Sequence, residues 1–256
     1  MAITTTCRRS RYRLATVGFL LVAAACTGVG EQRSSTPAAT STPAPTVSAS
    51  KAVTPTLSAA STLSTLRTIG KVLGDGAMPA YAVELPDGWS AGDSHFMVKD
   101  GASVFGVSVW DAVQVPSDPC HWKGHMTTPG PTVDDLVRAL VAQPTRNATT
   151  PTDVTLAGHA GKYLEWSVPE DMVVTGDADF DGCDTWPDNG HRDFVSWLST
   201  GGGERYQQFA GQVDRLWVLD VNGLRLVIDA TYPPDATDAA RAEVVQIVES
   251  MQFFIS

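Results

Sequence analysis

The sequence has little charge, and it lacks two familiar short catalytic patterns. Charged residues make up 18% of the 256 residues, whereas about a quarter is usual in a globular protein. Neither a glycine-rich phosphate-binding loop ending in lysine nor an H-E-x-x-H zinc pattern occurs. We assign no catalytic residue. A non-catalytic role is therefore favoured, although the sequence leaves enzymatic activity open.

Positive charge is scarce in the part of the chain that could fold. The formal net charge is −10 at pH 7, and four of the 18 basic residues precede Cys26, whereas none of the 28 acidic residues does. An acidic protein repels the phosphate backbones of nucleic acids. We therefore expect no nucleic-acid partner.

The apolar run near the N-terminus is too short to cross a bilayer, but it has the length of a signal-peptide core. Arg8–Arg13 form a basic region, and the run Leu14–Ala25 follows it with 12 residues. A bilayer span needs about 20 residues, so this run fits the hydrophobic region of an export signal. We predict a signal peptide over residues 1–25. Ordinary secretion without a lipid and an uncleaved membrane anchor are the alternatives.

The end of this run, Ala23–Cys26, resembles the lipobox of bacterial lipoproteins, in which the cysteine thiol receives diacylglycerol. Ala23 departs from the family pattern, which usually has leucine at that position. The resemblance implies that Cys26 carries a lipid, with acyl chains such as palmitate, and becomes the first residue of the mature chain. It also implies an extracytoplasmic location on the outer face of the cell membrane.

Residues 26–76 are predicted to form a disordered linker. Serine, threonine, alanine and proline dominate residues 27–67, and aromatic residues are absent there. Such a composition cannot bury enough apolar surface to offset the entropy lost on ordering. A flexible coil of about 40 residues would span roughly 35 Å. We therefore expect a stalk that joins the membrane to a folded domain over residues 77–256.

The remaining residues alternate between strand and helix patterns. The expected strands are Tyr81–Leu85, Ser103–Trp110, Val154–Ala157, Lys162–Val168, Phe194–Leu198, Arg215–Val221 and Leu224–Asp229. Thr132 and Asp135 form a capping-box pattern at the start of a helix, and a final helix is expected from about Asp235 to Ser250. This order predicts an α+β fold, with a mainly antiparallel twisted β-sheet and two packing helices.

The clearest local signal is a hairpin at Asn222–Gly223, because Asn-Gly favours a two-residue turn between strands. A two-residue turn fixes the register. Val221 is then opposite Leu224, and Asp220 is opposite Arg225 on the other face. Apolar and charged cross-strand pairs therefore both fit this pairing.

Four cysteines occur in the sequence. Cys7 would leave with the signal peptide, and Cys26 would be blocked by its lipid. The two cysteines that remain would be in an oxidising compartment. We predict a Cys120–Cys183 disulfide, with two free thiols as the alternative.

An acidic segment matches the first half of a calcium-binding loop. Asp177, Asp179 and Asp181 are spaced as in D-x-D-x-D-G, and Gly182 takes the turn position. Asp188 stands at position 12 in place of the usual bidentate glutamate. The segment is therefore either a calcium site formed by these four aspartates or a solvated acidic loop. Calcium is the only cofactor that we consider for it.

Two histidines and two tryptophans surround the predicted disulfide. His121 and His125 have the i, i+4 spacing that could hold zinc on a helix, but Trp122 stands where a zinc-protease pattern needs glutamate. The alternative is a pair of loop histidines without a metal. Trp122 and Trp186 are in loops close to the two cysteines. With the histidines, they are the candidate recognition surface.

Several stretches of the domain resemble actinobacterial lipoproteins and secreted proteins of uncharacterised function. They are Leu85–Trp89, Asp118–Trp122, Asn147–Leu156 and Asp214–Asp220. The strand followed by Pro-x-Gly-Trp and the final helix followed by Met251-Gln-Phe-Phe are also similar to PsbP-like domains. The resemblance implies a fold but no catalytic residues.

These features predict a lipid-anchored extracytoplasmic lipoprotein with a non-catalytic domain that binds a ligand or a partner. Its partners would be the membrane, through the N-terminal lipid, and an unidentified envelope ligand or protein. The alternative is an envelope enzyme or a calcium- or zinc-dependent factor. Its site would gather scattered residues such as His121, His125 and Asp181.

Overall fold

The computed structural model describes residues 66–69, 78–91, 95–187 and 190–254. The predicted signal peptide, the lipidation residue Cys26 and most of the predicted linker lie outside the described residues. Within the linker range, Leu66–Ile69 form strand β1. In the described part of the chain, no helix is long and apolar enough to span a membrane.

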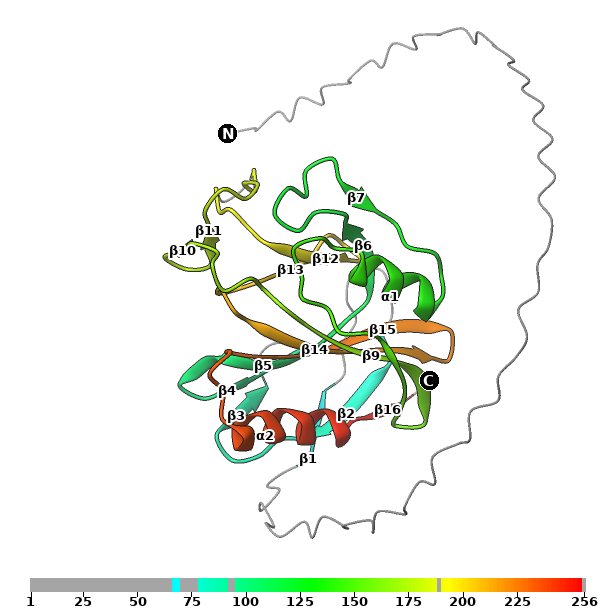
Figure 1. Cartoon of the computed structure of the whole chain (residues 1–256). Coiled ribbons are helices and arrows are strands. Elements are labelled where there is room, and N and C mark those ends of the chain that lie inside the picture. Colours follow the sequence, from blue (N-terminus) through cyan, green and yellow to red (C-terminus); the bar gives the residue numbers. More distant parts are fainter. Residues whose placement is uncertain (1–65, 70–77, 92–94, 188–189, 255–256) are drawn as a thin grey trace, which may run out of the picture. The chain divides into compact units, whose positions relative to one another are not determined.

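A seven-stranded antiparallel sheet forms the middle layer of the domain (Figure 1). In spatial order, its strands are β3 (Trp89–Ala91), β4 (Phe96–Lys99), β5 (Ala102–Trp110), β15 (Leu224–Tyr232), β14 (Val213–Val221), β9 (His159–Ser167) and β8 (Thr152–Leu156). Every pairing in this sheet is antiparallel. The predicted class of sheet is therefore confirmed.

The central hairpin β14–β15 has the predicted turn and register. Asn222 and Gly223 have φ values of 53° and 84°, which suit a tight turn that matches the twist of the strands. Val221 pairs with Leu224, and Asp220 pairs with Arg225. The next hairpin, β8–β9, turns at Ala157–Gly158. Strand β9 therefore begins at His159, earlier than the predicted Lys162.

One face of the sheet is covered by helix α2 (Asp238–Glu249) and a three-stranded sheet (Figure 1). That small sheet has the order β1, β2 (Ala80–Glu84) and β16 (Gln252–Phe254). Val244, Ile247 and Val248 of α2 are buried in the core between these layers. The helix begins later than predicted, because Thr237 caps it by accepting a hydrogen bond from the Ala240 N–H at 3.2 Å.

The opposite face is covered by helix α1 (Val133–Val141) and a four-stranded sheet (Figure 1). The order of that sheet is β13 (Glu204–Tyr206), β12 (Val195–Ser199), β6 (Ala112–Pro116) and β7 (Met126–Thr127). Trp110, Trp166 and Trp197 are buried in the core on this side. The domain is thus a sheet with one helix and one smaller sheet on each face.

Helix α1 starts with the predicted capping box. The Thr132 hydroxyl accepts a hydrogen bond from the Asp135 N–H at 3.1 Å, and the Asp135 carboxylate accepts one from the Thr132 N–H at 3.2 Å. Leu136, Val137 and Leu140 are buried, whereas Val141 at the end of the helix is exposed.

The long polar segment before β12 contains a further two-stranded hairpin. It consists of β10 (Val174–Thr175) and β11 (Asp179–Phe180). This hairpin packs with Val168 and Phe194 in a small separate core next to the disulfide. The described part of the chain is therefore an α+β domain with two helices, as predicted from the order of its elements.

Candidate functional site

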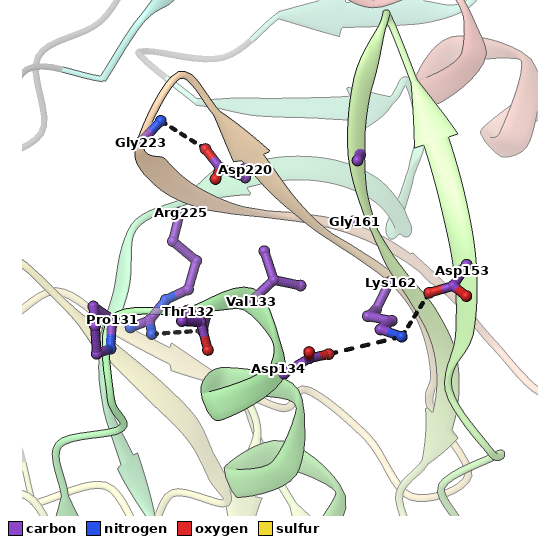
Figure 2. Close-up of a pocket in the computed structure, with 11 residues that line it drawn as sticks. Pro131, Thr132, Val133, Asp134, Asp153, Gly161, Lys162, Asp220, Gly223 and Arg225 are labelled. Atoms are coloured by element: carbon purple, nitrogen blue, oxygen red, sulfur yellow. Dashed lines mark hydrogen bonds and ion pairs between the residues drawn. The ribbon is translucent and has the colours of Figure 1, made fainter.

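Two adjoining pockets lie around the turn of the central β14–β15 hairpin. The first has a volume of about 490 Å³ and lies between the start of α1, the hairpin turn and strands β8 and β9 (Figure 2). The second has a volume of about 330 Å³ and reaches the first residues of β6. The two share Pro131, Gly223 and Arg225 as lining residues. Together they are called the hairpin-tip double pocket.

The first pocket is lined by charged side chains of both signs. Lys162 Nζ lies 2.6 Å from an Asp153 oxygen and 3.7 Å from an Asp134 oxygen, and Figure 2 shows it between the two carboxylates. The Lys162 side chain is 28% exposed, whereas those of Asp134 and Asp153 are 68% and 89% exposed. The hydrogen bond to Asp153 raises the pKa of Lys162. The ammonium group is therefore held charged beneath more exposed carboxylates.

Arg225 joins the hairpin to the segment that precedes α1. Its guanidinium donates to the carbonyl oxygens of Ala112 at 3.0 Å, Thr132 at 3.2 Å and Gly130. Asp220 is opposite Arg225, as predicted, but its carboxylate accepts from the Gly223 N–H at 2.6 Å. The register is thus confirmed, while each of the two side chains binds backbone groups. Burial lowers the pKa of Arg225, since charge is less stable away from water.

The second pocket is mainly apolar. Its apolar lining side chains are Met78, Ala112, Val113, Pro129, Pro131, Leu224 and Leu226. Leu224, the first residue after the turn, is 46% exposed. An exposed leucine on the wall of a pocket costs stability in water, and that cost is relieved when a ligand covers it. The hairpin-tip double pocket therefore has a charged half and an apolar half.

The predicted disulfide between Cys120 and Cys183 is present, with 4.5 Å between the two Cα atoms. It connects the loop after β6 with the acidic segment that follows β11. The backbone supports the same junction, because the Asp184 N–H donates to the Cys120 carbonyl at 2.8 Å. Both loops are therefore held by covalent and hydrogen-bond contacts.

The two loop tryptophans stack on each other rather than facing solvent as a pair. The rings of Trp122 and Trp186 have centroids 4.1 Å apart and planes inclined by 27°. Trp122 is only 7% exposed, and its indole N–H donates to the Asp193 carbonyl at 3.2 Å. His121 and His125 are exposed. The structure thus brings the tryptophans together, but Trp122 contributes little to any recognition surface.

An arginine occupies the carboxylates of the predicted calcium loop. Two nitrogens of the Arg192 side chain bind the Asp179 carboxylate at 2.8 and 2.9 Å, and a third binds Asp181. These bonds hold the pKa of Asp179 well below its usual range. Asp177 is exposed, and Asp188 lies outside the described residues. A calcium ion at this loop would have to displace Arg192.

No metal cluster is formed by the side chains that the structure describes. Among residues 78–91, 95–187 and 190–254, no group of three or more histidine, cysteine, aspartate or glutamate residues is placed to hold an ion. The two histidines and the acidic loop therefore do not combine into one site. The predicted calcium and zinc sites stay predictions.

A buried ionic network connects the four-stranded sheet to the seven-stranded sheet, and it was not predicted from the sequence. Arg205 of β13 binds Asp229 of β15 at 2.5 Å and Asp214 of β14 at 3.2 Å. Both aspartates are fully buried. Arg146 lies 3.9 Å from Asp214, with its guanidinium 4.1 Å from the Trp166 ring centroid. The network connects the layers of the domain. Its sequence signal was the occurrence of aspartates at inward positions of apolar strands.

A G-x-S-x-G pattern is present in the sequence at Gly88–Gly92, with Ser90 as its serine, so the expectation that the chain contains no such pattern is wrong. The catalytic form of this pattern places the serine on a sharp turn between a strand and a helix. Here Ser90 is the middle residue of the short strand β3, and its hydroxyl donates to Asp100 at 2.8 Å. The pattern therefore lacks the backbone context of a nucleophilic serine.

Comparisons with known proteins identify no family for this chain. A scan against protein-family models finds no match, and no curated protein matches the sequence. Among solved structures, the solution structure of cyanobacterial PsbP (CyanoP) from Synechocystis sp. PCC 6803 is similar, with 15% sequence identity. The alignment covers 72% of this chain and 98% of that chain, with a TM-score of 0.33.

Proposed function

We propose that this chain is a lipid-anchored extracytoplasmic protein whose folded domain binds an envelope ligand or partner without catalysing a reaction. The residues that line the hairpin-tip double pocket are the main support for this proposal. Its described lining residues include no serine, cysteine or histidine. Lys162 is held protonated by its carboxylate partners, and the Thr132 hydroxyl caps α1. The pocket therefore offers contacts for a ligand but no activated nucleophile.

The N-terminal sequence and the disulfide support the location. A basic region, a short apolar run and Cys26 follow one another as they do in lipoprotein signals. A disulfide such as Cys120–Cys183 persists in oxidising compartments outside the cytosol. Both features favour an exported protein, and the resemblance of Ala23–Cys26 to a lipobox favours an anchored one.

The experiment that tests the location compares two cysteine variants of the full chain. Cys26→Ala removes the proposed lipid acceptor, so the protein is expected in the medium with its domain folded. Cys7→Ala, within the proposed signal peptide, is the matched control and is expected to stay with the membrane. Retention of the Cys26→Ala protein in the membrane fraction would show that the apolar run itself is the anchor.

The same released protein tests binding. Added back to isolated cell envelopes, the Cys26→Ala protein is expected to sediment with them. A further Leu224→Ser change should reduce this retention, because it removes the exposed apolar side chain of the double pocket. Val173→Ser is the control, since Val173 is also exposed but lies outside both pockets. Equal loss in both variants, or no retention at all, would contradict binding through the double pocket.

A further inference from the structure

We propose that the hairpin-tip double pocket binds a peptide segment of an envelope protein that carries an apolar side chain near a lysine or arginine. This inference rests on the proposed binding function and adds the chemical class of the ligand. Three properties of the double pocket support it: the exposed carboxylates, the apolar side chains of its wall and its length.

The cations of the double pocket are already engaged by the protein. Lys162 contacts both Asp134 and Asp153, and Arg225 donates to three backbone carbonyls. The carboxylates of Asp134 and Asp153 are more exposed to solvent than the Lys162 side chain between them. Asp220 is exposed at the hairpin turn. An approaching ligand therefore meets negative charge, and a cationic group is complementary to it.

The net charge of the whole chain also favours a cationic ligand. The formal net charge of −10 includes the basic residues of the proposed signal peptide, so the mature protein would be more acidic still. A negative protein attracts cationic ligands over several ångströms and repels anionic ones. Anionic lipid and phosphate ligands are therefore poor candidates for this site.

The apolar half requires more of the ligand than a positive charge. Pro131 lies on the wall where the halves meet, and Leu224, Met78 and Val113 line the apolar half. A simple polyamine has only short methylene linkers between its charged amines, and no bulky side chain to cover these residues. A ligand that uses both halves must therefore carry an apolar group as well as a cation.

The span of the double pocket suits a peptide better than a single amine or amino acid. The lining of the first pocket alone runs from Asp153 on β8 to Arg225 on β15, across three strand spacings, and the second pocket adjoins it at Arg225. At about 4.8 Å per spacing this is roughly 14 Å, the length of about four extended residues. A peptide of four to six residues, at about 3.3 Å each, can place its two side chains in the two halves.

The proposal is tested by fluorescence anisotropy with the purified full chain and three labelled hexapeptides. The first contains leucine and lysine separated by three serines, so that both side chains point to the same face of an extended peptide. In the second, glutamate replaces the lysine, and in the third, serine replaces the leucine. The first peptide is expected to bind, and the other two are expected to bind at least about tenfold more weakly. Equal binding of all three, or no binding of the first, would overturn the proposal.

Matched charge variants test whether the double pocket is the site. Asp134→Asn/Asp220→Asn removes two pocket-lining charges, one in the first turn of a helix and one at the end of a strand next to a turn. Asp87→Asn/Asp238→Asn removes one charge in a turn and one in the first turn of a helix, both outside the two pockets. The first pair should weaken binding about tenfold, and the second should leave it unchanged. Equal effects would place the peptide elsewhere and overturn the proposal.

Two other outcomes distinguish peptide binding from self-association and from binding of another class of ligand. If the chain self-associates and Asp134→Asn/Asp220→Asn abolishes that association, the occupant is a second copy of this chain and the peptide proposal fails. If the first peptide does not bind while envelope retention still depends on Leu224, the binding function stands and only the ligand class is wrong.

Discussion

At the residue scale, the buried carboxylates of this domain differ in the charges that surround them. Asp214 and Asp229 lie against Arg205, so their burial is offset by an opposite charge. Burial nevertheless raises the pKa of Asp229 to about 7. Asp193 is also buried. Its burial, followed by the nearby charge of Glu204, raises its pKa to about 6. Carboxylates of this kind make folding stability depend on pH.

Asp193→Asn should stabilise the protein at neutral pH. Because the pKa of Asp193 is higher in the folded state, the folded protein binds its proton more tightly than the unfolded chain does. This contribution is present in full below about pH 4 and is lost as the pH rises through about 6. The variant should gain about 1 kcal/mol at neutral pH and nothing in acid. Urea unfolding at both pH values measures this, with the exposed Asp87→Asn as control. A gain that is the same at both pH values would contradict it.

At the element scale, two hairpins and a capped helix position the double pocket. The β14–β15 turn presents Asp220 and Arg225, and the β8–β9 hairpin presents Asp153 and Lys162. The strands β9 and β14 must approach closely for these side chains to share one pocket. A Cβ atom on Gly161 of β9 would lie 2.1 Å from the Val218 carbonyl oxygen of β14. The glycine is therefore required for this approach.

Gly161→Ala should destabilise the domain. The added methyl group would force β9 away from β14, at a cost of about 1–3 kcal/mol. Gly106→Ala is the control in the same sheet, because its Cβ atom would meet its nearest neighbour, the Met97 carbonyl oxygen, at 3.4 Å. Chemical denaturation of both variants gives the comparison. Equal stability of the Gly161 variant and the wild type would mean that the strands can separate without cost.

At the scale of the whole molecule, the layers and the loops are connected in two ways. Arg205 joins the four-stranded sheet to the seven-stranded sheet from within the core. The Cys120–Cys183 disulfide joins the loop after β6 to the acidic segment. It lies beside the small core that contains Phe180 and Phe194. This core contains only four buried residues, one of them Cys183 itself, so the disulfide is expected to supply much of its stability.

Cys120→Ser/Cys183→Ser should lower the free energy of unfolding. The disulfide joins residues 63 positions apart, and the chain-entropy model gives about 4 kcal/mol for a loop of that length. Urea unfolding of the double variant and the wild type measures the difference. With a reductant present, the two proteins should have the same stability. A difference that persists under reduction would mean that the serines, rather than the missing bond, are responsible.

Local chemistry accounts for the features that were predictable from the sequence. Asn222–Gly223 determines the turn and register of β14–β15 through backbone conformation alone. Thr132 determines the start of α1 through hydrogen bonds to residues three positions away. The order of strand and helix patterns predicts the α+β class. Alternation does not predict the burial of β14 and β15, which are buried on both faces because their sheet is the middle layer. The disulfide was predictable because elimination left only Cys120 and Cys183.

Only the tertiary structure decided which distant groups meet. Trp122 is buried because Trp186, from a loop 64 positions later in the chain, stacks on it. Asp179 is bound by Arg192 because the chain after β11 folds back beside that strand, where the Phe180 N–H donates to the Arg192 carbonyl. The double pocket joins the start of α1 with two hairpins from different parts of the sequence. Such meetings depend on how the layers pack, and the periodicity of a single segment contains no information about them.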